Sequence, residues 1–170
     1  MSQNKVFLAL GSNVGNWKVN FNSCLMELKK ISKLKAIANI YVSKPYGYKK
    51  QNDFYNTVVE VKTRNNPFQL MNQIKIIEKK LHKNKILING PRRIDIDIIF
   101  FNSLNISYKK LIIPHPRVSE RDFVLLPLFD IDPFFKHPQS KKSIKALTTE
   151  LKTTYIKKSI RQPKEMFVIH

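Results

Sequence analysis

The stretch Asn89-Gly-Pro-Arg-Arg-Ile-Asp-Ile-Asp-Ile-Ile-Phe-Phe101 combines a Gly-Pro turn, two arginines and a run with strand alternation. Because side chains in a strand alternate between its two faces, Asp95 and Asp97 are predicted to point to one face and the intervening isoleucines to the other. From residue 98 to 101 both faces are apolar, which is typical of a strand buried on both sides. We therefore predict a central strand that carries a pair of carboxylates at its beginning.

This pair of carboxylates requires a positive partner. Burying two neighbouring acids without a cation costs about several kcal/mol or more. Arg92 and Arg93 are one candidate, as structural ion-pair partners. The other candidate is Mg²⁺, which proteins hold with one or two carboxylates plus substrate phosphates. The two acids by themselves favour neither alternative.

The arginines of the chain are scarce and unevenly placed. Among 31 Lys and Arg residues only six are arginine, and four of these lie between positions 92 and 121: Arg92, Arg93, Arg117 and Arg121. The planar fork of arginine suits phosphate and carboxylate groups better than lysine does. His115 and Phe123 belong to the same segment. Acids for a metal and arginines for phosphates together predict a nucleoside triphosphate site.

Length and composition bound the class of protein. A chain of 170 residues that is 42% hydrophobic and 25% charged is predicted to form one globular domain over residues 1–170. The single cysteine, Cys24, excludes an intramolecular disulfide. The first residues do not resemble a signal peptide, and no apolar run approaches the length of a membrane span. We expect a cytoplasmic protein with no membrane partner.

The net charge of +19 raises the question of nucleic acid binding. The lysines are spread along the chain as pairs, however, and the sequence contains no basic region with heptads, zinc-ligand spacing or aromatic RNA-binding signature. We interpret most of the lysines as solvated surface charge and expect no nucleic acid partner.

The order of predicted elements defines the fold class. Helices are expected at residues 17–31, from Pro67 to Leu81, at 118–129 and at 144–151. Strands are expected at residues 5–10, 36–41, 54–62, 94–101 and 111–113, with a hairpin turn at 102–105 and a last short strand at 167–169. This order predicts an α+β protein, a ferredoxin-like α/β/α sandwich with a mostly antiparallel sheet.

Four groups of residues occur in the order and spacing of a known family. They are Ala9-Leu-Gly-Ser-Asn13, Pro45-x-Gly47 with Asp53-Phe-Tyr-Asn56, Gly90-Pro-Arg-x-Ile-Asp-x-Asp97, and Pro114-His-Pro-Arg117 with Arg121-x-Phe123. Over positions 6–130 the chain resembles 6-hydroxymethyl-7,8-dihydropterin pyrophosphokinase of folate biosynthesis. The resemblance implies a ferredoxin-like monomer that transfers diphosphate from ATP to the hydroxymethyl group of the pterin, leaving AMP.

The resemblance also implies roles for individual residues. Asp95 and Asp97 match the ligands of two Mg²⁺ ions, and with Arg92 they form the catalytic group. The matching ATP-binding residues are Glu78, Arg92, His115 and Arg121, and we add Lys83 and Lys85, which could close over the phosphates. The matching pterin-binding residues are Ser43, Pro45, Tyr46, Phe54, Asn56 and Phe123.

Some positions depart from the family pattern. His82-Lys-Asn-Lys85 stands where Gly-Arg-x-Arg is usual, and Asn89 stands where tryptophan is usual. Ser43 replaces the common threonine and Tyr46 the common leucine. Surface charge is the alternative interpretation for Glu78 and for the two lysines of the departing segment.

Overall fold

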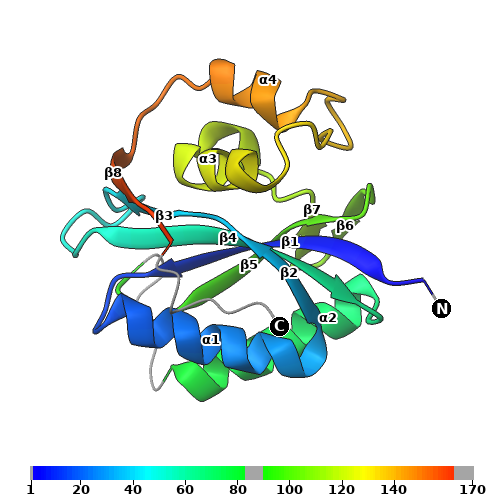
Figure 1. Cartoon of the computed structure of the whole chain (residues 1–170), viewed down its shortest axis with the longest axis horizontal. Helices are drawn as coiled ribbons and strands as arrows, with labels where there is room; N and C mark the ends of the chain where they lie inside the picture. The colour runs from blue at the N-terminus through cyan, green and yellow to red at the C-terminus, as the bar shows by residue number, and fades with distance from the viewer. Residues whose placement is uncertain (1, 83–89, 163–170) are drawn as a thin grey trace.

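A computed structural model of the chain describes residues 2–82 and 90–162 (Figure 1). The first half contains β1 (Asn4–Ser12), α1 (Trp17–Ile31), β2 (Lys33–Ile37), β3 (Ile40–Ser43), β4 (Phe54–Thr63) and α2 (Pro67–Leu81). The second half contains β5 (Asp95–Phe101), β6 (Ile106–Tyr108), β7 (Leu111–Ile113), the 3₁₀ helix η1 (Val118–Glu120), α3 (Asp122–Ile131), α4 (Ile144–Thr149) and β8 (Ile156–Ile160).

The main sheet has helices on both faces. Its strands follow the order β5-β1-β4-β3-β8, with β2 also paired to β4, and the pairs are antiparallel. Helices α1 and α2 cover one face, and α3 covers the other, with α4 packed on the outer side of α3 (Figure 1). This arrangement confirms the predicted α+β sandwich with a mostly antiparallel sheet.

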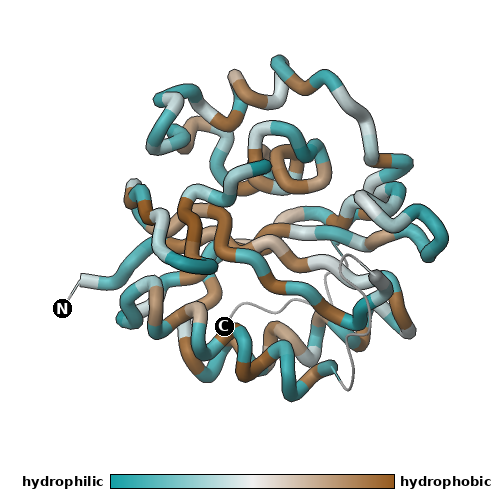
Figure 2. The backbone as a smooth tube through the Cα atoms, turned by 180° about the vertical axis from the view of Figure 1, so that it is seen from behind, coloured by the Kyte–Doolittle hydropathy of each residue, from teal (hydrophilic) through white to brown (hydrophobic). Residues whose placement is uncertain are grey.

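Strand alternation divides the apolar side chains between two cores. In β1, Val6 and Leu8 pack in the core under α1 and α2, whereas Phe7 packs with Val58 in the core under α3. Hydrophobic residues accordingly concentrate in the sheet and in α3, and the loops at the ends of the sheet are largely hydrophilic (Figure 2). Residues of the sheet that face α3 can therefore line a site only where this second core ends.

The strand β5 was predicted to be central, and this prediction is wrong. It lies at one end of the strand order, paired with β1 among the described strands. It is nevertheless buried from Ile98 to Phe101, because α2 packs on one face and α3 on the other. A β-bulge opposite Phe7 and Leu8 turns both Ile99 and Phe100 toward α3, which explains an apolar run without alternation.

The predicted strand at residues 36–41 is two strands in the structure. β2 and β3 both pair with β4, and the amide of Ala38 between them donates to the carbonyl of Val58. The pairing of β2 with β4 also has a register shift between Leu34 and Ala36. Because β2 and β3 both pair with the long strand β4, the apolar residues on either side of the break stay in the same sheet, and the sequence reads as one strand.

The segment after β5 also differs from the predicted hairpin. The turn at 102–105 leads into β6, which was not predicted, and β6 pairs with the predicted strand β7 in a separate two-stranded sheet. The C-terminal side holds a second unpredicted strand, β8, which pairs with β3. The strand predicted at 167–169 lies outside the described residues.

The predicted helices are present with small shifts of their ends. Asn66 caps α2 through a complete capping box with Gln69, and Pro67 begins the helix as predicted. The predicted helix at 118–129 is divided into η1 and α3, and that at 144–151 is α4. Helix α3 begins at Asp122, so the side chain of Phe123 lies in its first turn.

Candidate active site

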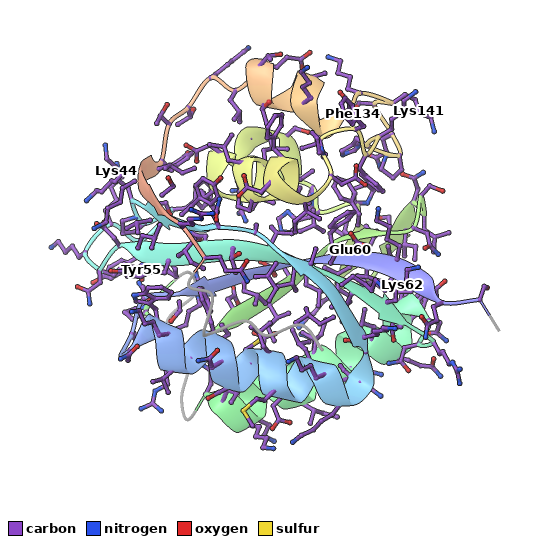
Figure 3. The ribbon with its side chains drawn as sticks, in the orientation of Figure 1. Lys44, Tyr55, Glu60, Lys62, Phe134 and Lys141 are labelled. Carbon is purple, nitrogen blue, oxygen red and sulfur yellow. The ribbon has the colours of Figure 1, made fainter. Side chains whose placement is uncertain are left out.

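A cavity of about 290 Å³ opens at the end of the sheet, on the face covered by α3. Lys44 and Tyr55 lie at this end, Lys44 on the side of α3 and Tyr55 on the side of α1 (Figure 3). The cavity is lined by Ala9, Leu10, Gly11, Ser43, Lys44, Tyr46, Phe54, Asn56, Thr57, Arg92, Asp95, Asp97, Ile99, His115, Arg121, Phe123 and Val124.

The two carboxylates of β5 point into this cavity from one face of their strand. Asp95 pairs in register with Gly11 of β1 and Asp97 with Ala9, so the β1 residues beside both acids are small. Ile96 between them is buried in the opposite core. The prediction that both acids share one face is therefore confirmed, and small β1 neighbours leave room around them.

Arg92 is held at the mouth of the cavity by its backbone. Its amide donates to Oδ1 of Asn13 (2.9 Å), and its carbonyl accepts from the amide of Asn13 (3.0 Å). The same Asn13 side chain donates to Oε1 of Gln51 and to the carbonyl of Asn52. Asn13, which is buried, thus joins three loops around Arg92.

The guanidinium of Arg92 lies between an acid and an aromatic ring. One terminal nitrogen is 3.7 Å from a carboxylate oxygen of Asp95, and its central carbon is 5.0 Å from the centroid of Phe54. Its Nε is buried and has no hydrogen-bond partner in the part of the chain that the structure describes. A buried donor without a partner costs about 1–3 kcal/mol, so this nitrogen favours an incoming acceptor.

Arg121 contributes a second guanidinium with the same property. Its central carbon lies 4.8 Å from the ring centroid of Tyr46 and 5.7 Å from that of Phe123. Its Nε is likewise buried without a partner among residues 2–82 and 90–162. Arg117 covers the ring of Tyr46 and donates to its hydroxyl. The cavity therefore offers buried, positively charged donors of the kind that bind phosphate oxygens.

His115 lies beside these arginines. Burial lowers its pKa most, and the guanidinium groups of Arg121 and Arg117 lower it further. Together they move the pKa from 6.5 to about 4, against the opposing effect of Asp95. Its Nδ1 accepts from the amide of Arg117 (3.2 Å), so the ring proton of the neutral form is on Nε2. At neutral pH, His115 can therefore donate one hydrogen bond without adding charge to the cavity.

The lowered pKa of His115 predicts how stability depends on pH. The unfolded chain takes up this proton near pH 6.5 and the folded chain only near pH 4, so the folded state is stabilised above pH 6.5. As the pH falls from 6.5 to 4, about 2–3 kcal/mol of unfolding free energy should be lost through this group. Urea titrations at both ends of this range measure the loss.

The matched variant is His115→Gln, which cannot be protonated. Its loss of stability between pH 6.5 and 4 should be smaller than that of the unaltered protein by about the same 2–3 kcal/mol. Other acid-sensitive groups, including His137, are common to both proteins and cancel in the difference. Parallel pH profiles for the two proteins would contradict the assignment.

The polar floor of the cavity is formed by Asn56. Its Nδ2 donates to the carbonyl of Tyr41 (3.0 Å), to Oγ of Ser43 (2.9 Å) and to the carbonyl of Phe54 (3.3 Å). These contacts fix the amide so that Oδ1 remains as an acceptor next to Gly11. Phe54 and Phe123 add aromatic walls. The site can therefore hold a flat ring that carries N–H donors on its edge.

Most of the predicted site residues line this one cavity. Ser43, Tyr46, Phe54, Asn56, Arg92, Asp95, Asp97, His115, Arg121 and Phe123 do so. Pro45 lies between two lining residues without lining it itself. Glu78 lies on α2, on the opposite face of the sheet, and its role in ATP binding stays a prediction. Lys83 and Lys85 lie outside the described residues.

Other lining residues were not predicted as site residues. Lys44 and Thr57 are adjacent to predicted residues, and Val124 follows Phe123 in α3. Ala9 and Gly11 belong to the quoted family motif, and their small size could have indicated that they leave room for a ligand. Lys44 carried no signal that separated it from the many surface lysines.

The acids of the cavity fit a metal that brings further ligands with its substrate. Among residues 2–82 and 90–162, no group of three or more His, Cys, Asp and Glu side chains is placed to hold an ion by itself. Asp95 and Asp97 line the cavity together with Arg92, His115 and Arg121, whose N–H groups can donate to phosphate oxygens. Two carboxylates plus phosphate oxygens are a usual donor set for Mg²⁺.

Comparisons with known proteins give a consistent result. Residues 7–133 match the family model described as 7,8-dihydro-6-hydroxymethylpterin-pyrophosphokinase (HPPK). The chain is 36% identical over 145 residues to 2-amino-4-hydroxy-6-hydroxymethyldihydropteridine pyrophosphokinase of Aquifex aeolicus, which covers 85% of this chain and 91% of the relative. It is 43% identical over 141 residues to folic acid synthesis protein fol1 of Pneumocystis carinii.

Some of these relatives are much longer than this chain. The match to the Pneumocystis protein covers 82% of this chain but 19% of the relative. The crystal structure of Plasmodium falciparum HPPK-DHPS superposes with a TM-score of 0.71 at 20% identity, over 87% of this chain and 44% of that one. At this low identity the superposition supports the fold alone.

Proposed function

This chain belongs to the 7,8-dihydro-6-hydroxymethylpterin-pyrophosphokinase family, and we propose that it transfers diphosphate from ATP to 6-hydroxymethyl-7,8-dihydropterin. The products are AMP and the pterin diphosphate, an intermediate of folate synthesis. The observation that carries the proposal is a cavity in which paired carboxylates, two phenylalanines and two arginines meet, the arginines with Nε atoms that have no partner among the described residues.

The cavity holds groups that suit both substrates. Phe54, Phe123 and the acceptor Oδ1 of Asn56 suit the flat pterin ring and its N–H edge. Arg92 and Arg121, which lie against Phe54 and Phe123, suit the phosphates of ATP. A pterin beside these rings therefore has its hydroxymethyl group close to the phosphates.

The reaction is an in-line displacement at the β-phosphorus of ATP. The hydroxymethyl oxygen forms a bond to this phosphorus and releases its proton to solvent, while the bond between the β-phosphorus and the oxygen bridging to the α-phosphate breaks and AMP leaves with that oxygen. Positioning and charge stabilisation supply most of the acceleration in such transfers. Arg92 and Arg121 donate to phosphate oxygens, and neutral His115 donates from Nε2 without adding charge.

We propose that Asp95 and Asp97 hold two Mg²⁺ ions together with the phosphates of ATP. When bound, these ions supply positive charge that offsets the negative charge developing on the phosphate oxygens. Asp95 is also 3.7 Å from Arg92, so one carboxylate links the metal-binding pair to the arginine. Glu78, Lys83 and Lys85 stay candidates for ATP contacts, and Pro45 for the rim of the pterin pocket.

We further propose that the chain acts as a cytoplasmic monomer on small molecules rather than on nucleic acid. No helix within residues 2–82 and 90–162 is long and apolar enough to cross a membrane. The rival function, binding of nucleic acid through the net charge of +19, predicts affinity for polynucleotides that falls steeply with salt. The polar and aromatic cavity favours the small-molecule alternative.

The deciding experiment measures AMP formed from ATP by the purified chain. AMP should appear only when 6-hydroxymethyl-7,8-dihydropterin and Mg²⁺ are both present, in amounts equal to the pterin diphosphate. Omission of either component is the matched control. Release of ADP, or ATP hydrolysis independent of the pterin, would sink the proposal. Polynucleotide binding measured at low and high salt tests the rival.

Asn13 is expected to matter for turnover because it holds the backbone of Arg92. Asn13→Ala removes the acceptor for the Arg92 amide and the donor to Gln51 and Asn52, and should cost about 1–3 kcal/mol of unfolding free energy. Turnover should fall at least tenfold as Arg92 loses its fixed direction, by analogy with small misplacements of catalytic groups. Urea unfolding and steady-state rates measure both effects.

The matched control for this prediction is Asn20→Ala. Asn20 donates to Oγ of Ser12 and to the carbonyl of Val14, so the variant loses two side-chain hydrogen bonds in the same region. Its contacts do not include Arg92, and turnover should stay close to that of the unaltered protein. Equal losses of turnover in the two variants would refute a specific role for Asn13.

A further inference from the structure

The C-terminal side of the chain reaches the cavity through Tyr155. This residue immediately precedes β8 and lies beyond residues 7–133, which the family model covers. Its ring is 5.7 Å from that of Phe123, with an interplanar angle of 86°, and 5.7 Å from that of Tyr46, with an angle of 64°. Phe123 and Tyr46 line the cavity, whereas Tyr155 stands behind them.

The backbone of Tyr155 is tied to the same two elements that its ring contacts. Its amide donates to Oδ2 of Asp122 at the start of α3 (2.8 Å), one residue before Phe123. Its carbonyl accepts from the amide of Lys44 (2.9 Å), two residues before Tyr46. The two cavity walls come from segments far apart in the sequence, and Tyr155 connects both of them.

Asp122 makes this connection firm. Its side chain is buried, at 4% exposure, and Oδ2 also accepts from the amide of Ile156 (3.0 Å). A carboxylate that accepts two backbone N–H groups forms stronger hydrogen bonds than a neutral acceptor does. Strand β8 is held by a second contact, the 2.7 Å ion pair of Lys157 with Asp53. The position of Tyr155 is therefore determined by β8 and α3 rather than by its own ring.

We propose that Tyr155 is a positioning residue that fixes the orientation of Phe123, and of Tyr46 beside it, and thereby the fit of the pterin ring against Phe123. The proposal rests on the proposed function, since it names the pterin as the occupant. Edge-on aromatic contacts have a preferred geometry, so a ring that touches both walls limits the orientations of each. Loss of the Tyr155 ring should then weaken pterin binding more than ATP binding, since Phe123 is a wall of the pterin pocket while Arg121 only rests against the two rings.

The test compares Tyr155→Ala with Tyr155→Phe. Both variants keep the backbone hydrogen bonds to Asp122 and Lys44, so they separate the ring from the anchoring of β8. The control for loss of an edge-on tyrosine elsewhere is Tyr108→Ala, since Tyr108 contacts Phe68 and does not line the cavity. Pterin affinity is measured with a non-hydrolysable ATP analogue and Mg²⁺ present, and analogue affinity is measured without pterin.

Tyr155→Ala should weaken pterin binding about tenfold, because Phe123 and Tyr46 are no longer held in place in the free protein and binding must order them. Its affinity for the ATP analogue should fall by clearly less than its affinity for pterin, and its rate at saturating pterin should stay within about twofold of the unaltered protein. Tyr155→Phe and Tyr108→Ala should bind pterin normally. Unchanged pterin affinity in Tyr155→Ala, or an equal loss of analogue affinity, would overturn the proposal.

A measurement without substrate keeps this inference separate from the proposed function. With phenylalanine-selective labelling, the NMR signal of Phe123, identified through Phe123→Leu, should shift or broaden in Tyr155→Ala and stay in place in Tyr155→Phe. An unshifted Phe123 signal in Tyr155→Ala would refute the positioning role even in an active enzyme. If the unaltered protein forms no pterin-dependent AMP, the proposed function fails, and the Phe123 signal still decides the positioning role.

Discussion

Asp95→Asn and Asp97→Asn are each expected to lower turnover by about 10³-fold or more while the protein stays folded. A metal that stabilises transition-state charge contributes about several kcal/mol, and each 1.4 kcal/mol corresponds to about a factor of ten. Both carboxylates line the cavity from the same face of β5, so both variants remove a metal ligand and neither leaves a hole in a core. Steady-state rates over a range of Mg²⁺ concentrations measure the effect.

The stability of the same variants decides between the metal and a structural ion pair. Removal of one acid from a repelling pair should change the unfolding free energy by less than about 1 kcal/mol, even though Asp95 is 3.7 Å from Arg92. Glu120→Gln is the matched control, since it removes an exposed carboxylate that does not line the cavity. Normal turnover combined with marked destabilisation in Asp95→Asn would assign that carboxylate to the ion pair instead.

Arg92→Ala is expected to lower the rate of the bound complex by about 10²–10³-fold, the usual loss for one donor that stabilises a transition state. The structure strengthens this expectation, because Asn13 clasps the Arg92 backbone and its guanidinium is directed to the cavity with Nε unpartnered among the described residues. Affinity for an ATP analogue should change much less. Single-turnover rates and analogue binding separate the two quantities.

Four further variants sharpen the test of Arg92. Arg92→Lys should recover only part of the rate, because an ammonium group cannot donate as a fork. Arg93→Ala removes an equal charge from the neighbouring exposed position, which does not line the cavity, and should be close to normal. Lys83→Ala and Lys85→Ala should each cost less than Arg92→Ala. Weak analogue binding with a normal bound-state rate in Arg92→Ala would make Arg92 a binding residue.

Local sequence patterns predicted most of the helices and strands of this protein and the residue types of its candidate site. Alternation in β5 placed Asp95 and Asp97 on one face, and the Asn66-Pro67 pair marked the start of α2, because these features depend on neighbouring residues alone. The paired acids and the clustered arginines predicted a shared site, and Arg92, Asp95, Asp97 and Arg121 do line one cavity, while phosphate and metal binding stay predictions. Such inferences need only the residue types and their spacing.

Tertiary structure decided the features that depend on pairing between distant segments. The sequence could not indicate that β5 lies at the end of the strand order, because α2 and α3 bury its second half as fully as a central strand. It also could not predict that β8, whose exposed lysines hide its periodicity, pairs with β3 and brings Tyr155 behind Phe123 and Tyr46. Burial and strand pairing are properties of the whole fold, so only the three-dimensional arrangement determines them.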